Sequence, residues 1–150
     1  EERVINPYQL ANINNEWYLY AFDHKRCDIR CFVPTRILDV ESTGKIFERP
    51  DSFTLDKYLA DSFGVYKGDE SYGIRVRFTK TVAPFIKEKN WHPTQQIKNL
   101  KDGSVELSLQ LSHLSDIQRW ILGWGSQAIV LAPKELAEAV RAEAQGIVDN

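Results

Sequence analysis

Residues 95–112, QQIKNLKDGSVELSLQLS, decide the fold of the second half of the chain. Two runs with alternating apolar and polar residues flank Asp102-Gly103, and an Asp-Gly pair in such a place is a strong β-hairpin signal. In the second run every other residue is apolar: Val105, Leu107, Leu109 and Leu111. Since side chains alternate across a strand, these four fall on one face. The stretch therefore predicts a hairpin with one buried face.

Working outward from this hairpin, the pattern alternates between strand and helix. Before it, residues 72–78 alternate around Arg75 and Arg77 as a strand, and a helix is expected from Thr81. After it come a helix from Ser115 to Gly125, a strand over 128–131 and a helix opening at Pro133. The order strand, helix, strand, strand, helix, strand is that of the split βαβ, ferredoxin-like arrangement. This half is predicted to be α+β, with helices on one face of an antiparallel sheet.

The first half is predicted to be rich in short strands. Strands are expected at 17–22, 29–33, 36–40 and 46–47, a spacing typical of a small barrel or curled sheet. The period then changes, and a helix is predicted over 51–64, with Thr54 as its N-cap and Gly64 at its end. Residues 67–71 are the best linker candidate. The predicted domains are therefore 1–66 and 72–150, and the predicted fold class is mixed β and α+β.

Composition narrows the class of protein. The chain has 150 residues and a formal net charge of −2, which argues against a general nucleic-acid coat. No apolar run approaches the roughly 18 residues that a membrane span requires. Two cysteines, Cys27 and Cys31, are interpreted as reduced thiols of a cytoplasmic protein. The chain has no methionine and opens on Glu1, which suggests a fragment of a longer protein.

The chain offers no recognisable catalytic or metal-binding motif. It contains neither a Gly-x-Ser-x-Gly elbow nor a His-Glu-x-x-His zinc helix. His24, His92 and His113 are too far apart in sequence to suggest a metal site. We therefore expect no enzyme, no catalytic residue, no metal and no cofactor, with slow nucleotide turnover as the least favoured alternative.

Six pieces of the sequence, in order, resemble one family. Trp17-Tyr18-Leu19 resembles the tripeptide that gives WYL domains their name. Residues 3–10 resemble the lead-in to that tripeptide, and Arg30-Cys31-Phe32 with Arg36-Ile37 resembles the arginine-phenylalanine stretch that follows it. The second half is similar to the WCX-type extension found after many WYL domains. Its three pieces are Asp102-Gly103, residues 120–125 and residues 131–136.

The resemblance implies a fold and a class of function. WYL domains are small SH3-like or Sm-like barrels that usually follow a winged helix-turn-helix domain in bacterial transcription regulators. They are thought to sense ligands, with nucleotides or single-stranded nucleic acid favoured, and the extension commonly dimerises. We therefore expect a homodimer that contacts DNA through an N-terminal domain absent from this chain, and no membrane partner. The chain departs from the family at Val33, where many members have a second arginine, and it lacks the family's upstream strand.

The resemblance also nominates a ligand site. Arg30 and Arg36 are the candidate phosphate ligands, because arginine binds phosphate as a bidentate fork. Tyr18 and Tyr8 are the candidate ring contacts. The simpler interpretation has the arginines solvated or paired with carboxylates such as Asp23, and Tyr8 packed in a core.

Other basic and aromatic residues receive a structural interpretation. Lys25 and Arg26 are expected to be solvated loop charges, and Arg75 and Arg77 solvated charges on a strand. Trp120 and Trp124, four residues apart, are expected to pack in the core. The alternative to ligand sensing is a ligand-free dimerisation module of the same class of regulator.

Overall fold

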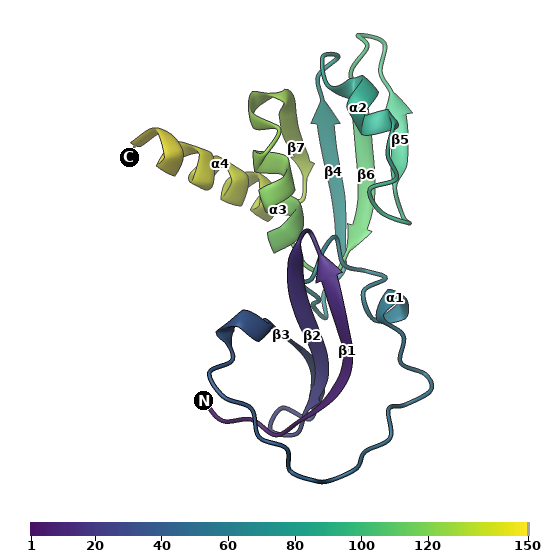
Figure 1. Cartoon of the computed structure of the whole chain (residues 1–150). Coiled ribbons are helices and arrows are strands. Elements are labelled where there is room, and N and C mark those ends of the chain that lie inside the picture. Colours follow the sequence, from purple (N-terminus) through teal and green to yellow (C-terminus); the bar gives the residue numbers. More distant parts are fainter. Residues whose placement is uncertain (150) are drawn as a thin grey trace. The chain divides into compact units, whose positions relative to one another are not determined.

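The computed structural model describes residues 1–149 and divides the chain between Tyr58 and Leu59 into two compact units. Each unit has its own antiparallel sheet (Figure 1). The predicted mixed β and α+β class is confirmed. Among the described residues no helix is long and apolar enough to cross a lipid bilayer.

The first unit is built on a tight hairpin. Strand β1 (Ile5–Ile13) pairs with β2 (Glu16–Asp23), which pairs with β3 (Asp28–Phe32), in the order β1-β2-β3. The turn consists of Asn14 and Asn15, whose φ angles are 53° and 64°. Positive φ at both positions matches the twist of a two-residue hairpin, and asparagine tolerates that conformation. The register shifts by one residue between Pro7 and Gln9, which places Asp23 opposite Ile5.

The rest of the first unit has less regular structure than predicted. Pro34–Arg36 forms a single 3-10 turn, and residues 37–54 form neither helix nor strand. The strands predicted at 36–40 and 46–47 were therefore wrong, and the described sheet lacks the further strands that close a barrel. Proline fixes φ and has no amide to donate to a neighbouring strand, which explains the turn at Pro34. Leu38 and Ile46 are fully exposed, so these apolar residues have no core to enter within the described chain.

The helix predicted over 51–64 is also wrong in length, because α1 covers only Leu55–Tyr58. Thr54 does cap it, accepting a hydrogen bond from the Lys57 amide at 3.4 Å. Beyond Tyr58 the backbone bonds to other parts of the second unit. The Asp61 carbonyl accepts from the Ser112 amide at 2.8 Å. The carboxylate of Asp116 accepts from the amides of Val65 and Tyr66 at 2.9 and 3.0 Å.

The second unit has the predicted ferredoxin-like arrangement. Its sheet has the order β5-β6-β4-β7, so the first strand of the unit lies between the third and the fourth. The elements in chain order are β4 (Tyr72–Phe78), α2 (Ala83–Lys87), β5 (Gln96–Asn99), β6 (Val105–Leu111), α3 (Ser115–Leu122), the 3-10 turn η2 (Gly125–Gln127), β7 (Ala128–Ala132) and α4 (Lys134–Asp149).

The core of this unit lies between one face of the sheet and the helices. Alternate residues of β4 and β6 are buried there with Ile86 of α2, Ile117 and Ile121 of α3 and Leu136 of α4. Trp120 and Trp124 pack against this cluster, as predicted. Helix α4 then runs away from the sheet (Figure 1). Ile147 and Val148, in its last turns, are exposed.

Candidate functional site

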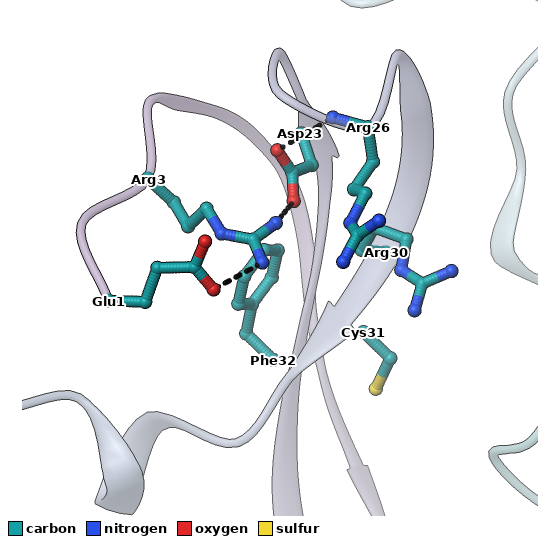
Figure 2. A pocket seen from close by; sticks show the side chains of 7 residues that line it. All are labelled: Glu1, Arg3, Asp23, Arg26, Arg30, Cys31 and Phe32. Atoms are coloured by element: carbon teal, nitrogen blue, oxygen red, sulfur yellow. Dashed lines mark hydrogen bonds and ion pairs between the residues drawn. The ribbon is translucent and has the colours of Figure 1, made fainter.

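A pocket of about 290 Å³ lies in the first unit, where β2 and β3 meet the N-terminal segment. Its lining is mainly charged, as Figure 2 shows. The residues around it are Glu1, Arg3, Asp23, Arg26, Arg30, Cys31 and Phe32. Three arginines thus face two carboxylates, which leaves an excess of positive charge.

Asp23 organises one side of the pocket. It is the last residue of β2 and its side chain is almost fully buried. Its carboxylate forms an ion pair with Arg3 and accepts hydrogen bonds from the Lys25 and Arg26 amides at 2.9 and 3.3 Å. Burial opposes ionisation, but the two amides and the guanidinium outweigh it and lower the pKa of Asp23. Asp23 is therefore ionised at neutral pH and holds the loop after β2 in place.

Glu1 occupies the outer side of the same cluster. Its carboxylate accepts from Arg3 at 2.8 Å and also pairs with Lys25. These hydrogen bonds from Lys25 and Arg3 lower the pKa of Glu1 to about 2. Arg3 is thus shared between two carboxylates, and Lys25 has a partner of its own.

Arg26 and Arg30 differ from Arg3 because neither side chain has a carboxylate partner. Within residues 1–149 no ion pair or side-chain hydrogen bond engages either guanidinium. In Figure 2 the Arg26 side chain runs from the loop toward Arg30, so two like charges face the same pocket. Such an arrangement is suited to an anion, since each guanidinium has its donors available.

The structure separates the four predicted site residues. Arg30 lines the pocket, whereas Arg36 lies in the exposed 3-10 turn and is not part of the lining. Arg30 is paired with Ala21 across the sheet, and Tyr18 is three residues from Ala21 along β2. Because side chains alternate between faces, Tyr18 points to the face opposite Arg30. Tyr18 donates a hydrogen bond to Glu16 at 3.2 Å.

Tyr8 belongs to an aromatic cluster of the first unit. Its ring centroid lies 5.2 Å from that of Phe53 and 6.1 Å from that of Phe47. Tyr58 joins the cluster through Phe53 and Tyr20, and its hydroxyl donates to the Ile29 carbonyl at 2.8 Å. The structure thus gives Tyr8 the packing position that was the simpler interpretation.

Most residues of the pocket were not predicted from the sequence. Arg26 was interpreted as a solvated charge, Asp23 only as an alternative partner, and Arg3, Glu1 and Phe32 were not considered as site residues. The signal that reveals Arg3 is the Asn14-Asn15 turn. Counting back from that turn pairs Asn6 with Asp23, and the irregularity between Pro7 and Gln9 shifts the partner by one residue to Ile5, so Arg3 lies at the same end of the sheet.

Comparison with known proteins agrees with the resemblance described above. The family model of the WCX domain matches residues 70–148, and that of the WYL domain matches residues 1–42. Protein PafC of Mycobacterium tuberculosis is 27% identical over 147 residues, which cover 98% of this chain and 45% of that protein. Protein PafC of Mycobacterium leprae is 24% identical over 148 residues, or 99% of this chain and 44% of that protein.

Among solved structures, the proteasome accessory factor B/C (PafBC) of Arthrobacter aurescens matches with a TM-score of 0.42 and 18% identity. The match covers 97% of this chain and 22% of that one. The chain thus spans less than half the length of the curated relatives it matches.

Proposed function

The chain belongs to the WCX domain family and carries a WYL domain in its first 42 residues, and from this we propose that it is the ligand-sensing and dimerising region of a bacterial transcription regulator. Its role is regulatory rather than catalytic. The proposed ligand is a nucleotide or a single strand of nucleic acid. It binds in the pocket between Arg26 and Arg30.

The observation that supports this proposal is the pair of guanidiniums without carboxylate partners. Arginine recognises phosphate with two parallel N–H donors, and two arginines on one pocket match a phosphate group from two sides. The Phe32 ring in the lining adds an apolar surface for the rest of the ligand. The pocket volume of about 290 Å³ suits a phosphate with part of its sugar or base rather than a large ligand.

Regulation follows if the ligand favours one geometry of a dimer. A ligand shifts an equilibrium only when it binds the two states with different affinity. The dimer then carries the change to a DNA-binding domain elsewhere in the regulator. The length of the curated relatives leaves room for such a domain, since this chain covers 45% of the M. tuberculosis protein.

The test is thermal shift of the purified protein with ATP and with a short oligothymidylate at two salt concentrations. We expect a salt-sensitive stabilisation that Arg30→Gln and Arg26→Gln each remove, because ionic phosphate contacts weaken with salt. Arg75→Gln, on the second unit, is the matched control and keeps the response. A response that survives both pocket substitutions would place the ligand elsewhere. The predicted ligand contacts of Arg36, Tyr18 and Tyr8 remain predictions. Substitutions at these three positions are tested in the same assay.

A second candidate function is a ligand-free dimerisation module, and the dimerisation that it shares with the first candidate is supported by strand β7. It lies at the edge of its sheet and has no charged residue, and Ile129 and Leu131 are 51% and 42% exposed. Edge strands without charges are prone to pair with another chain. Sedimentation of the Ile129→Lys variant tests this candidate, and a dimer that persists unchanged argues against it.

A further inference from the structure

The second unit has a pocket of its own, with a different chemistry. It has a volume of about 340 Å³ and is lined by Val82, Phe85, Glu88, Lys89, Trp91 and Trp124. Apart from Glu88 and Lys89 the lining is apolar and mostly aromatic. Phe85 is 54% exposed, so its phenyl ring forms a solvent-exposed wall of the pocket. A hollow apolar surface of this kind is typical of a binding site.

The Trp91 side of the pocket is fixed by hydrogen bonds. The Trp91 indole donates to the Ile86 carbonyl at 2.9 Å, which sets the orientation of the ring. The side-chain amide of Gln95 forms hydrogen bonds with the backbone of both Lys89 and Trp91. Its oxygen accepts from the Trp91 amide at 2.7 Å, and its nitrogen donates to the Lys89 carbonyl at 3.2 Å. The position of the Trp91 ring is therefore fixed before any ligand arrives, which reduces the entropic cost of ordering this side chain on binding.

The indole rings of Trp91 and Trp124 are nearly perpendicular and form a corner. Their ring centroids are 6.2 Å apart and their planes meet at 85°. Trp120 backs both rings, with centroids 4.9 Å from Trp91 and 5.8 Å from Trp124. A flat aromatic ligand that stacks on one indole therefore meets the other edge to face, and both geometries are favourable.

The two charged residues of the lining, Lys89 and Glu88, further restrict the chemical class of the ligand. The Lys89 ammonium lies over the Trp91 ring, 5.4 Å from its centroid, in a cation–π contact, so a ligand ring that stacks on this indole takes the place of the ammonium. Neither Lys89 nor Glu88 forms an ion pair with another residue of the described chain, 1–149. A cation attracts an acidic group on the ligand, and a carboxylate accepts a hydrogen bond from an amino group.

We propose that this pocket binds a planar heteroaromatic ring that carries an amino group and an anionic group, as an adenine nucleotide does. The ring stacks in the corner of Trp91 and Trp124 against Phe85. Its anionic group pairs with Lys89, and its amino group donates to Glu88. This site is separate from the arginine pocket of the first unit and does not depend on the function proposed for that pocket.

The test uses the tryptophan indole N–H signals in NMR spectra of the ¹⁵N-labelled protein, since the chain has four tryptophans. The probes are AMP, adenosine, which lacks the phosphate, and a short oligodeoxyadenylate. We expect AMP to shift the Trp91 and Trp124 signals and to leave that of Trp17 in place, and adenosine to bind more weakly. Saturation at lower concentration by AMP identifies a free nucleotide as the source of the ring. Saturation at lower concentration by the oligonucleotide identifies a single strand instead.

Two substitutions on the exposed rim test the assignment without opening the core. Phe85→Ala is expected to weaken AMP binding by roughly tenfold, within the range measured for loss of a stacking contact. Lys89→Ala is expected to weaken it by roughly the same factor, through loss of a charge-assisted hydrogen bond to the phosphate. Lys101→Ala, a lysine on the hairpin turn of the same unit, is the matched control and leaves binding unchanged. Arg30→Gln also leaves it unchanged, which separates this result from the test of the arginine pocket. The proposal is overturned if no probe shifts Trp91 or Trp124 at millimolar concentration, or if both rim variants bind like the control.

Discussion

The two units of this chain differ both in how they bury apolar residues and in how they use arginine. The second unit has a continuous core from its sheet to its helices, whereas in the described part of the first unit only Tyr20, Ala21 and Phe53 are buried apolar residues. Arg75 and Arg77 of the second unit pair with Glu106 and Asp102. Arg26 and Arg30 of the first unit have no such partners within residues 1–149.

This difference distinguishes arginines that already have a carboxylate partner from arginines whose donors are available to a ligand. Where a cross-strand carboxylate already neutralises an arginine, the pair contributes to the sheet and its donors are occupied. Where the carboxylates of a cluster are all directed to Arg3 and Lys25, the remaining guanidiniums have their donors free for a ligand. The comparison therefore predicts that core and turn substitutions matter most in the second unit, and that arginine substitutions affect stability there and binding in the first.

The largest effect is expected from the core of the second unit. Leu107 is fully buried on β6, and Leu107→Ala should lower the free energy of unfolding by about 3 kcal/mol through lost burial and a cavity. The matched control is Leu38→Ala in the first unit, where the side chain is fully exposed and the change should stay within about 0.5 kcal/mol. Urea unfolding measures both. Hydrogen exchange of the Leu107→Ala variant shows which strands are affected. Faster amide exchange in β4 and β6 with unchanged exchange in β1 and β2 supports two units that unfold independently. Equal acceleration in all four strands contradicts independent unfolding.

The next test concerns the acid sensitivity of the first unit. The folded-state pKa of Asp23 is lowered, so its contribution to stability is present above the unfolded pKa of about 3.9 and is lost as pH falls toward the folded value. Asp23→Asn should therefore be less stable at neutral pH and show a flatter decline in acid. Since the pKa of Glu1 is lowered as well, the comparison is made in a Glu1→Gln background. An unchanged acid profile would show that the Lys25 and Arg26 amides and Arg3 do not together favour the ionised form of Asp23 in solution.

The same contrast explains which parts of the fold could be predicted. The ferredoxin-like unit was predicted correctly because its signals are local: Asp102-Gly103 marks the turn, and alternation in residues 105–111 marks the buried face. The strand order then follows from a common topology. Asn14-Asn15 is a weaker turn signal than Asp-Gly, and the hairpin that it forms was missed. The apolar residues of 37–47 suggested strands, but no neighbouring strand in the described chain pairs with them.

The site was harder to predict than the fold. Arg30 was found because a family motif contains it. Arg3 and Asp23 lie twenty residues apart and meet only through the register of a hairpin that had not been recognised. Tyr18 was placed with Arg30 because both belong to the pieces of sequence that resemble the family. The alternation of strands β2 and β3 puts them on opposite faces.

A smaller effect is expected at two glycines with positive φ. Gly103 has a φ of +84° in the β5–β6 turn, and Gly44 has a φ of +69° in the irregular segment of the first unit. Gly103→Ala should cost about 1 kcal/mol, because the strands on both sides hold the left-handed conformation. Gly44→Ala should cost less, since the exposed backbone around it can change conformation. Equal losses in thermal unfolding would mean that residues 37–54 are held as firmly as the hairpin.

The smallest effect tests the arginine comparison directly. Arg75 donates to Glu106 at 2.8 Å on the open face of the sheet, and the Arg75→Gln substitution should cost about 0.5 kcal/mol, less at high salt. Arg30→Gln removes a charge that faces Arg26 without a carboxylate between them, so stability should stay the same or rise slightly. A double-mutant cycle of Arg75 with Glu106 isolates the pair energy in urea unfolding. If Arg30→Gln proves as costly as Arg75→Gln, then Arg30 has a structural partner in solution, and the positive charge of the first-unit pocket is not available to a ligand.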